Sequence, residues 1–224
     1  MTPAPIHLAG ERLLLDPAGA LVWPAQHLLA VADLHLAKGA AFAARGQLLP
    51  PYDSAVTLDR LAALLRRWRP QTVLALGDSF HDREGAARLG GAERARLGRI
   101  AAATRLVWIA GNHDPAPPEG LGGEPALEFA AGALRFRHRA LPRAETGCGE
   151  VSGHFHPKAT VPVAGTGLSR PCFLADARRI LLPAFGAYTG GLDISHPEIA
   201  ALFPRGGRAF LLGRERLYSF VIRR

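Results

Sequence analysis

Three short and almost wholly apolar runs constrain the fold of this chain more than any other feature. His27–Ala32 (HLLAVA), Thr72–Leu76 (TVLAL) and Arg105–Ala110 (RLVWIA) have the length and composition of buried strands. Two stretches between them, Ser54–Trp68 and Ala92–Ala103, carry apolar residues at helical spacing. Strands that alternate with helices in this way predict a sheet with helices packed against it.

The second half of the chain has a different pattern, in which short strands follow one another between turns. We therefore expect an α/β chain, α+β by the segregation of its two halves. It would form a four-layer αββα sandwich, with two mixed β-sheets face to face and flanking helices, and residues 1–224 would form one domain. The Pro- and Gly-rich stretch 115–125 is expected to be a surface loop, and 181–192 either core or an interface. The shorter strands expected are Leu13–Leu15, Ala20–Trp23, Leu127–Ala130, Ala133–His138, Glu150–Gly153, Ala159–Val163, Cys172–Ala175, Arg179–Leu182, Arg208–Leu212 and Leu217–Ile222.

The amino-acid composition argues against several classes of protein. The net charge is +8, carried almost entirely by arginine, which favours an anionic partner, although GC-rich coding would produce the same bias. No apolar run reaches the roughly 18 residues of a membrane span, and the first residues lack the pattern of a secretory leader. Two cysteines are too few for a disulfide scaffold or a four-cysteine zinc site, so we expect a cytoplasmic protein without membrane contact.

Three arginines alternate along one expected strand, namely Arg135, Arg137 and Arg139. This spacing places their side chains on one face, which predicts a solvated outer face or, alternatively, an anion-binding face.

Polar motifs follow the expected strands at the point where each strand ends. Asp33–His35 (DLH), Gly77–Asp82 (GDSFHD) and Gly111–Asp114 (GNHD) follow the three buried strands, and Gly153–His156 (GHFH) follows a strand of the second half. Each motif alone has an ordinary explanation, such as a turn or a pair of exposed histidines. Because ligands collect at the carboxyl ends of strands in α/β sheets, the common placement predicts that these motifs converge.

The residue types in these motifs suit divalent metal ions. Carboxylates and imidazoles without thiolates favour Mn, Fe or Zn. The candidate ligands are too many for one ion, whereas two ions about 3.5–4 Å apart, bridged by a carboxylate and a hydroxide, are suited to phosphoryl transfer. His138, at the end of a strand between Asn112 and His154, is a further candidate ligand.

The ordered motifs D-x-H, G-D, G-N-H-D, a lone His and G-H-x-H resemble the signature of the calcineurin-like metallophosphoesterase superfamily. The resemblance extends from Asp33 to His156. It implies a dinuclear centre in which one residue, Asp78, bridges both ions. The remaining ligands implied are Asp33, His35 and His156 for the first ion, and Asn112, His138 and His154 for the second.

The same resemblance implies roles for three residues that do not bind metal. His113 would lie over the substrate phosphate and protonate the leaving oxygen, and Asp114 would orient His113. The sequence Gly-Asp-x-Phe-His also resembles a motif of the double-strand-break repair nucleases of this superfamily. That similarity implies that His81 contacts the scissile phosphate; a supporting position behind the ligands is the equal alternative.

A narrower resemblance covers nearly the whole chain. Segments 33–39 (DLHLAKG), 45–54 (RGQLLPPYDS), 152–157 (SGHFHP) and 183–191 (PAFGAYTGG) are similar to the bacterial ligase-associated DNA damage response metallophosphoesterases. That family is encoded beside a DNA ligase, a helicase and a nuclease, and is described as manganese-dependent DNA endonucleases. The resemblance implies a phosphodiesterase with two Mn²⁺ ions that cleaves DNA, expected to be single-stranded, in DNA repair. Proteins of the repair operon are the partners it implies.

Four residues outside the metal motifs are candidate substrate contacts. Lys38 and Arg45 follow the first motif and could track a phosphate backbone, while Tyr52 and Tyr188 could stack on bases. Solvation or turn packing is the alternative for each. Two other functions stay open: a phosphodiesterase or phosphatase of small nucleotides, and a scaffold that keeps the fold without catalysis. The first would need a closed pocket, and the second would show broken ligand motifs, whereas every motif here is intact.

Overall fold

The computed structural model describes residues 1–116, 120–163 and 165–223. Its first half forms a seven-stranded sheet in the order β1-β2-β3-β4-β5-β6-β7. The first four strands pair antiparallel, and β4 to β7 pair parallel, so the sheet is mixed. Its strands are β1 (Ala4–Leu8), β2 (Glu11–Leu15), β3 (Leu21–Trp23), β4 (Leu28–Val31), β5 (Thr72–Leu76), β6 (Arg105–Ile109) and β7 (Glu124–Ala126).

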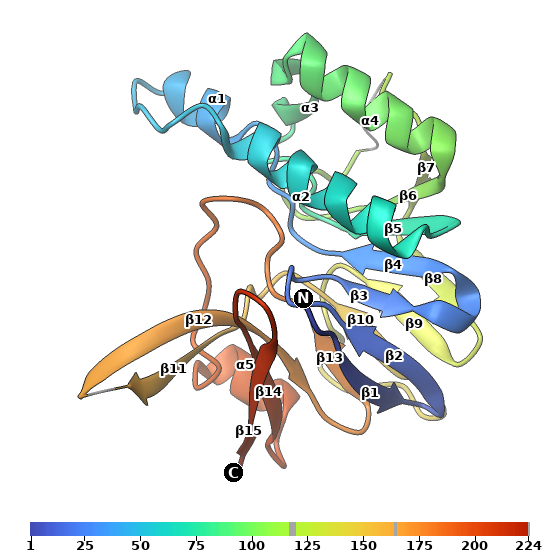
Figure 1. Cartoon of the computed structure of the whole chain (residues 1–224), viewed down its shortest axis with the longest axis vertical. Coiled ribbons are helices and arrows are strands. Elements are labelled where there is room, and N and C mark those ends of the chain that lie inside the picture. Colours follow the sequence, from blue (N-terminus) through green and yellow to red (C-terminus); the bar gives the residue numbers. More distant parts are fainter. Residues whose placement is uncertain (117–119, 164, 224) are drawn as a thin grey trace.

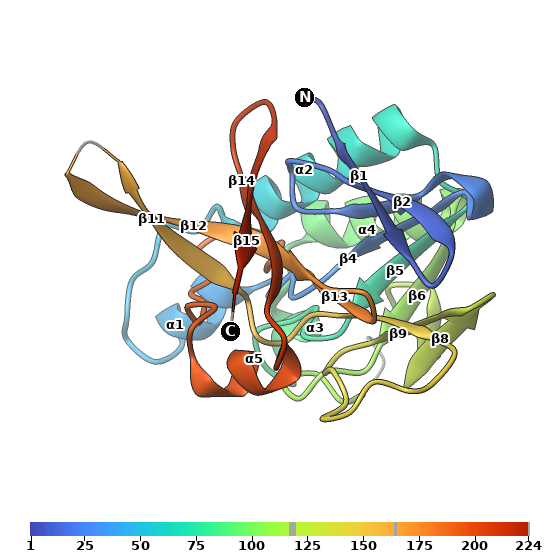
Figure 2. The ribbon, with the colours of Figure 1, turned by 90° about the horizontal axis from the view of Figure 1, so that it is seen from below.

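The second half forms an eight-stranded mixed sheet in the order β15-β14-β12-β13-β10-β9-β8, with β11 paired to β12. Strands β9, β10 and β13 run parallel to one another, and the other pairs are antiparallel. Figure 2 shows the β11–β12 hairpin extending away from the rest of the sheet. The strands are β8 (Glu128–Ala131), β9 (Leu134–Arg137), β10 (Gly149–Ser152), β11 (Lys158–Val163), β12 (Thr166–Ala175), β13 (Arg179–Leu181), β14 (Gly207–Leu212) and β15 (Leu217–Ile222).

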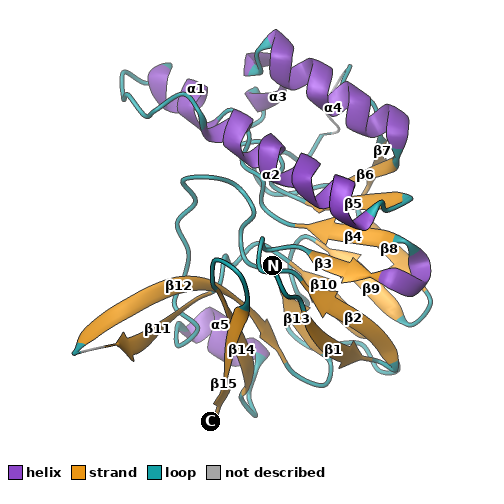
Figure 3. Ribbon diagram, viewed as in Figure 1, coloured by secondary structure: helices purple, strands orange, loops and turns teal. Residues whose placement is uncertain are grey.

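Helices lie on the outer side of each sheet, as Figures 1 and 3 show. The amphipathic α2 packs Leu58, Leu61 and Leu64 against the first sheet, and α5 packs Ile199 and Leu202 against the second. This arrangement confirms the four-layer αββα sandwich. The helices are η1 (Pro24–Gln26), α1 (Lys38–Ala43), α2 (Asp53–Trp68), α3 (Gly85–Arg88), α4 (Gly91–Ala103) and α5 (Pro197–Leu202).

The central core lies between the two sheets. Trp23 from the first sheet and Phe136 from the second are fully buried, and their ring centroids are 6.4 Å apart. Large aromatic rings bury the most apolar area per residue, so such pairs contribute strongly to holding the sheets together. In the 181–192 stretch, Leu181, Leu182 and Phe185 are fully buried, so this part of the stretch belongs to the core rather than to an interface.

The side chain of Arg137 corrects the expectation of a solvated arginine face. Arg137 is buried, and its guanidinium lies 2.9 Å from Glu128, 3.0 Å from Glu145 and 3.3 Å from Glu150. Three carboxylates satisfy the buried cation, as a buried charge requires. Arg139, two residues after Arg137, is exposed, as expected.

The structure also contains elements that periodicity did not indicate, namely β1, η1, β7, α1, α3 and α5. Each is six residues or shorter, and four of them contain a proline. Periodicity needs a longer window to be visible. None of the helices in the described part of the chain has the length and apolarity that a membrane span requires.

Candidate metal centre

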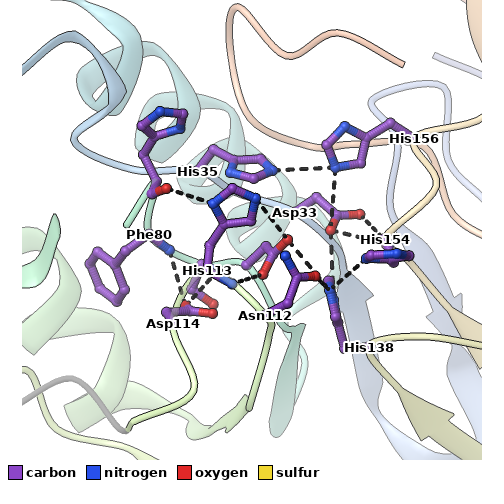
Figure 4. A network of polar contacts seen from close by, with 12 residues as sticks. Asp33, His35, Phe80, Asn112, His113, Asp114, His138, His154 and His156 are labelled. Carbon is purple, nitrogen blue, oxygen red and sulfur yellow. Dashed lines mark hydrogen bonds and ion pairs between the residues drawn. The ribbon is translucent and has the colours of Figure 1, made fainter. Parts of the chain in front are cut away.

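The sequence motifs converge where the strands of both sheets end. Asp33 and His35 follow β4, Asp78 follows β5, and Asn112 to Asp114 follow β6, three adjacent parallel strands. From the second sheet, His138 follows β9 and the 154–156 turn follows the adjacent parallel strand β10. Figure 4 shows side chains from both sheets pointing toward one another at this edge. The expected convergence is therefore observed.

Five of the candidate ligands have left-handed backbone conformations. The φ angles are 54° at Asp33, 43° at His35, 46° at Asp78, 71° at His154 and 45° at His156. A residue with a Cβ in this region carries a strain of order 1 kcal/mol, which persists only where the surroundings hold it. Here the carboxylate of Asp33 accepts a hydrogen bond from the backbone N–H of His154 at 2.9 Å. This hydrogen bond joins the strained turn after β4 to the strained turn after β10, so each turn stabilises the other.

The first ligand cluster consists of Asp33, His35 and His156. One ligand atom from each lies within 4.8 Å of the other two. The Nε2 atoms of His35 and His156 are 3.3 Å apart, and His156 Nε2 lies 3.4 Å from Asp33 Oδ1. Lone pairs of imidazole nitrogens that face each other beside a carboxylate form a fitting donor set for a divalent cation.

The second cluster consists of Asp78, His138 and His154, again with ligand atoms within 4.8 Å. His138 Nε2 lies 3.4 Å from Asp78 Oδ2 and 3.1 Å from His154 Nδ1. The amide oxygen of Asn112 is 2.9 Å from the same His138 nitrogen, which places it as a fourth donor. The other ring nitrogen of His138 lies 2.9 Å from the carbonyl oxygen of Leu76, which fixes the ring.

The two clusters are adjacent, because His138 Nδ1 of the second lies 3.7 Å from Asp33 Oδ1 of the first. The protonation states of His35 and Asp78 suit cation binding. Burial, followed by the neighbouring His156, lowers the pKa of His35 to about 3, so its imidazole is neutral. Burial alone would raise the pKa of Asp78, but hydrogen bonds and charge interactions with His138 and His113 outweigh it and lower the pKa to about 2. Neutral imidazoles and ionised carboxylates are the forms that bind metal.

His113 stands at the open side of the second cluster. Its Nδ1 lies 2.8 Å from the backbone carbonyl oxygen of His81, and its Nε2 lies 3.9 Å from Asp78 Oδ2. A carbonyl oxygen can only accept, so Nδ1 carries the hydrogen and Nε2 faces the cluster. The ring of His81 is 5.9 Å from the rings of both His35 and His113, which places it beside the ligands.

The contacts of Asp114 differ from the expectation that it orients the His113 ring. Its carboxylate accepts backbone N–H groups from Ser79 at 2.7 Å and Phe80 at 3.1 Å, and the His113 ring is held by the His81 carbonyl instead. The physical reason is that the left-handed turn at Asp78 leaves the next two amides without strand partners. Asp114 therefore braces that turn, and burial raises its pKa to about 7.

The candidate substrate contacts lie on the side of the site formed by α1. The Lys38 Nζ donates a hydrogen bond to the backbone carbonyl of Tyr188 at 2.8 Å. Arg45 is exposed and lies 3.8 Å from Asp82, and Tyr52 is exposed immediately before α2. Among the contacts of the described residues, none joins Arg45 or Tyr52 directly to a candidate ligand.

Sequence reasoning missed Phe42, whose ring centroid lies 5.4 Å from that of His81. Lys38 Nζ is 5.8 Å from the same Phe42 ring. The signal available was the i, i+4 spacing of Lys38 and Phe42, which would place both on one face of a helix. The helix α1 is too short for its periodicity to be recognised.

The chain is similar to known proteins in sequence and in fold. The sequence profile of the calcineurin-like phosphoesterases matches residues 27–176, a range that contains every candidate ligand. The chain is similar to the crystal structure of Pseudomonas putida nuclease MPE, at 29% identity and a TM-score of 0.74, covering 98% of this chain and 100% of that one. It is also similar to Yfce, a phosphoesterase from E. coli, at 16% identity and a TM-score of 0.47, covering 87% and 98%. Among curated proteins, no match is found.

Proposed function

The chain belongs to the calcineurin-like phosphoesterase family, and from that premise we propose that it is a metal-dependent endonuclease of single-stranded DNA. The observation that carries the proposal is the pair of adjacent ligand clusters at the edge where the two sheets meet. Similarity over the full chain to a protein described as a nuclease favours nucleic acid over a small phosphoester. The net charge of +8 also favours a polyanionic substrate.

Each cluster would hold one divalent cation, and the two cations would neutralise the phosphodiester and activate water when bound. Donors of the Asp, Asn and His type fit Mn²⁺, with Fe or Zn as alternatives. The assignment of Asp78 as the ligand shared by both cations is part of the proposal. Besides Asp78, the proposed ligands are Asp33, His35 and His156 for the first cation, and Asn112, His138 and His154 for the second.

His113 would act as the general acid. With its Nδ1 hydrogen donated to the His81 carbonyl, a proton on Nε2 faces the cluster and can pass to the leaving alkoxide. Alkoxides of deoxyribose have a high pKa and need this proton, whereas nitrophenolate leaves without it. The His81 side chain, beside His113 and His35, would contact the scissile phosphate.

The test is cleavage of a covalently closed circle of single-stranded DNA with added Mn²⁺. A circle has no ends, so linear product comes only from endonucleolytic cleavage. We expect His113→Ala to lower the cleavage rate about 10²-fold or more, and to lower hydrolysis of bis-p-nitrophenyl phosphate by less than about tenfold. His7→Ala is the matched control, because His7 is an exposed histidine on the edge strand β1.

The outcomes separate the alternatives. If the protein hydrolyses the nitrophenyl diester but leaves the circle intact, the substrate is a small nucleotide. If it does neither with any of the three metals, it is a scaffold with this fold. Equal losses for His113→Ala on both substrates would contradict the acid role.

The resemblance to ligase-associated enzymes extends the proposal to a cytoplasmic role in the DNA damage response, with the products of a repair operon as partners. We also propose that residues 1–224 act as one domain, because the central core draws side chains from both sheets. Loss of activity on expressing either sheet alone would agree with this.

A further inference from the structure

A continuous line of side chains leads away from the candidate metal centre along α1. His81, beside the ligands, has Phe42 at 5.4 Å between ring centroids, and the Lys38 ammonium lies 5.8 Å from the Phe42 ring. Lys38 in turn donates a hydrogen bond to the carbonyl oxygen of Tyr188. This hydrogen bond holds Tyr188 beside the site, although Tyr188 is 150 positions from Lys38 in the chain.

Tyr188 occupies a conformation that its residue type disfavours. Its φ is 58°, in the left-handed region, yet its side chain is 48% exposed. Neighbouring bonds hold it there: the backbone N–H of Ala187 donates to the Thr57 hydroxyl, and the Thr189 hydroxyl donates to the Gly186 carbonyl, both at 2.9 Å. An exposed aromatic ring kept in a strained backbone makes no contribution to the core, and such outliers concentrate at functional positions.

Two cationic side chains, Lys38 and Arg45, lie on this side of the metal centre. Lys38 uses one of its three donors on Tyr188 and keeps the others for a ligand. Arg45 lies 3.8 Å from Asp82, but Arg88 also pairs with that carboxylate, so the charge of Arg45 is only partly compensated. Asp82 directly follows His81 in the chain, so its contact with Arg45 places this cation beside the metal centre.

We propose that Lys38, Arg45 and Tyr188 form a nucleotide subsite beside the metal centre. In it Tyr188 stacks on a base and the two cations bind the phosphate that neighbours the scissile one. This inference rests on the proposed function and specifies its substrate class. A substrate must extend at least one nucleotide beyond the cleaved bond, with a base, to use the subsite. Single strands present unstacked bases and duplexes do not, so the subsite selects single-stranded DNA.

The experiment compares Tyr188→Asn with Tyr188→Phe. Asparagine tolerates the left-handed conformation and removes the ring, so the variant folds with an unchanged or higher melting temperature. We expect Tyr188→Asn to weaken binding of a single-stranded 20-mer about tenfold, measured by fluorescence anisotropy in EDTA, and to lower kcat/KM for its cleavage with Mn²⁺ by a similar factor. Tyr188→Phe retains the ring and keeps both values within about twofold.

Three comparisons make the test specific. Tyr218→Asn is the control, because Tyr218 has a similar exposure, 55%, and lies on β15 at the edge of the second sheet. On a strand of abasic sites, the protein and Tyr188→Asn should bind alike. Arg45→Met should reduce the slope of log Kd against log salt by about 0.7, and Tyr188→Asn should leave the slope unchanged.

The inference is overturned if Tyr188→Asn binds and cleaves the 20-mer as the unmodified protein does. It is also overturned if the variant weakens binding of the strand of abasic sites to the same degree, since that strand has no base to stack. Failure of the proposed function looks different: the unmodified protein itself then leaves DNA uncut. If it binds the 20-mer without cutting it, the anisotropy comparison still decides the subsite, and if it does neither, both proposals fall.

Discussion

Gly77 offers a direct test of how closely the backbone packs against a candidate ligand. Gly77 has a φ of 75°, and a Cβ placed there would lie 2.5 Å from both Cγ and Nδ1 of His138. The His138 ring cannot easily retreat, because its Nδ1 is bound at 2.9 Å to the carbonyl oxygen of Leu76. Gly77→Ala should therefore strain the turn and displace a ligand of the second cluster.

Two terms make up the expected loss of stability. The left-handed conformation costs an alanine about 1–2 kcal/mol relative to glycine. Overpacking against the fixed ring adds about 1–3 kcal/mol. The free energy of unfolding should fall by about 2–5 kcal/mol in total, and the displaced ligand should weaken Mn²⁺ activation about 10–100-fold.

Gly10→Ala isolates the backbone term, because Gly10 has a φ of 84° and nothing within 4 Å of its Cβ position. Urea unfolding of both variants without metal gives the two free energies, and titration of bis-p-nitrophenyl phosphate hydrolysis with Mn²⁺ gives the metal dependence. The reasoning is refuted if Gly77→Ala loses no more stability than Gly10→Ala and responds to Mn²⁺ like the unmodified protein.

Two further predictions concern the metal and the thiols. Mn²⁺ at about 100 times its Kd should stabilise the protein by about 2.7 kcal/mol, and Asp78→Asn should remove most of the resulting rise in melting temperature; an undiminished rise would exclude Asp78 as a ligand. Cys172 is fully buried, which raises the pKa of its thiol to about 12, whereas Cys148 is partly exposed. Native protein should therefore react with iodoacetamide at Cys148 alone and at both thiols in urea, as mass spectrometry of the alkylated peptides would show; rapid labelling of native Cys172 would contradict its burial.

The spacing of apolar residues was sufficient to predict the helices and strands that are long enough to show a full period. The expected helix Ser54–Trp68 is α2, Asp53–Trp68, and the expected strand Thr72–Leu76 is β5 with the same bounds. Burial of one face or of a whole strand imposes a spacing on the sequence, so these elements can be recognised without tertiary information. The short α1, with alanine and glycine among its six residues, carries no such spacing.

The chemistry of the site could also be predicted from the sequence, because motifs that follow neighbouring parallel strands must lie at one edge of the sheet. Asp33, Asp78 and Asn112 could be placed together on that basis. Their individual partners could not: Asp114 accepts amides of Ser79 and Phe80 rather than holding His113. A side chain's direction depends on the φ angles of its turn, which residue type alone does not determine.

The sequence by itself determined the layers, the strand ends at which the ligands collect and the class of metal that those ligands suit. Only the tertiary structure decided which atoms meet. Arg137 is buried rather than solvated because three glutamates from separate segments surround it. Tyr188 reaches Lys38 because the loop after β13 is bound along the turn of Asp33, where the Gly186 N–H donates to the Asp33 carbonyl. The physical reason is that periodicity records how much of an element is buried, whereas contacts between distant segments depend on register and turn geometry.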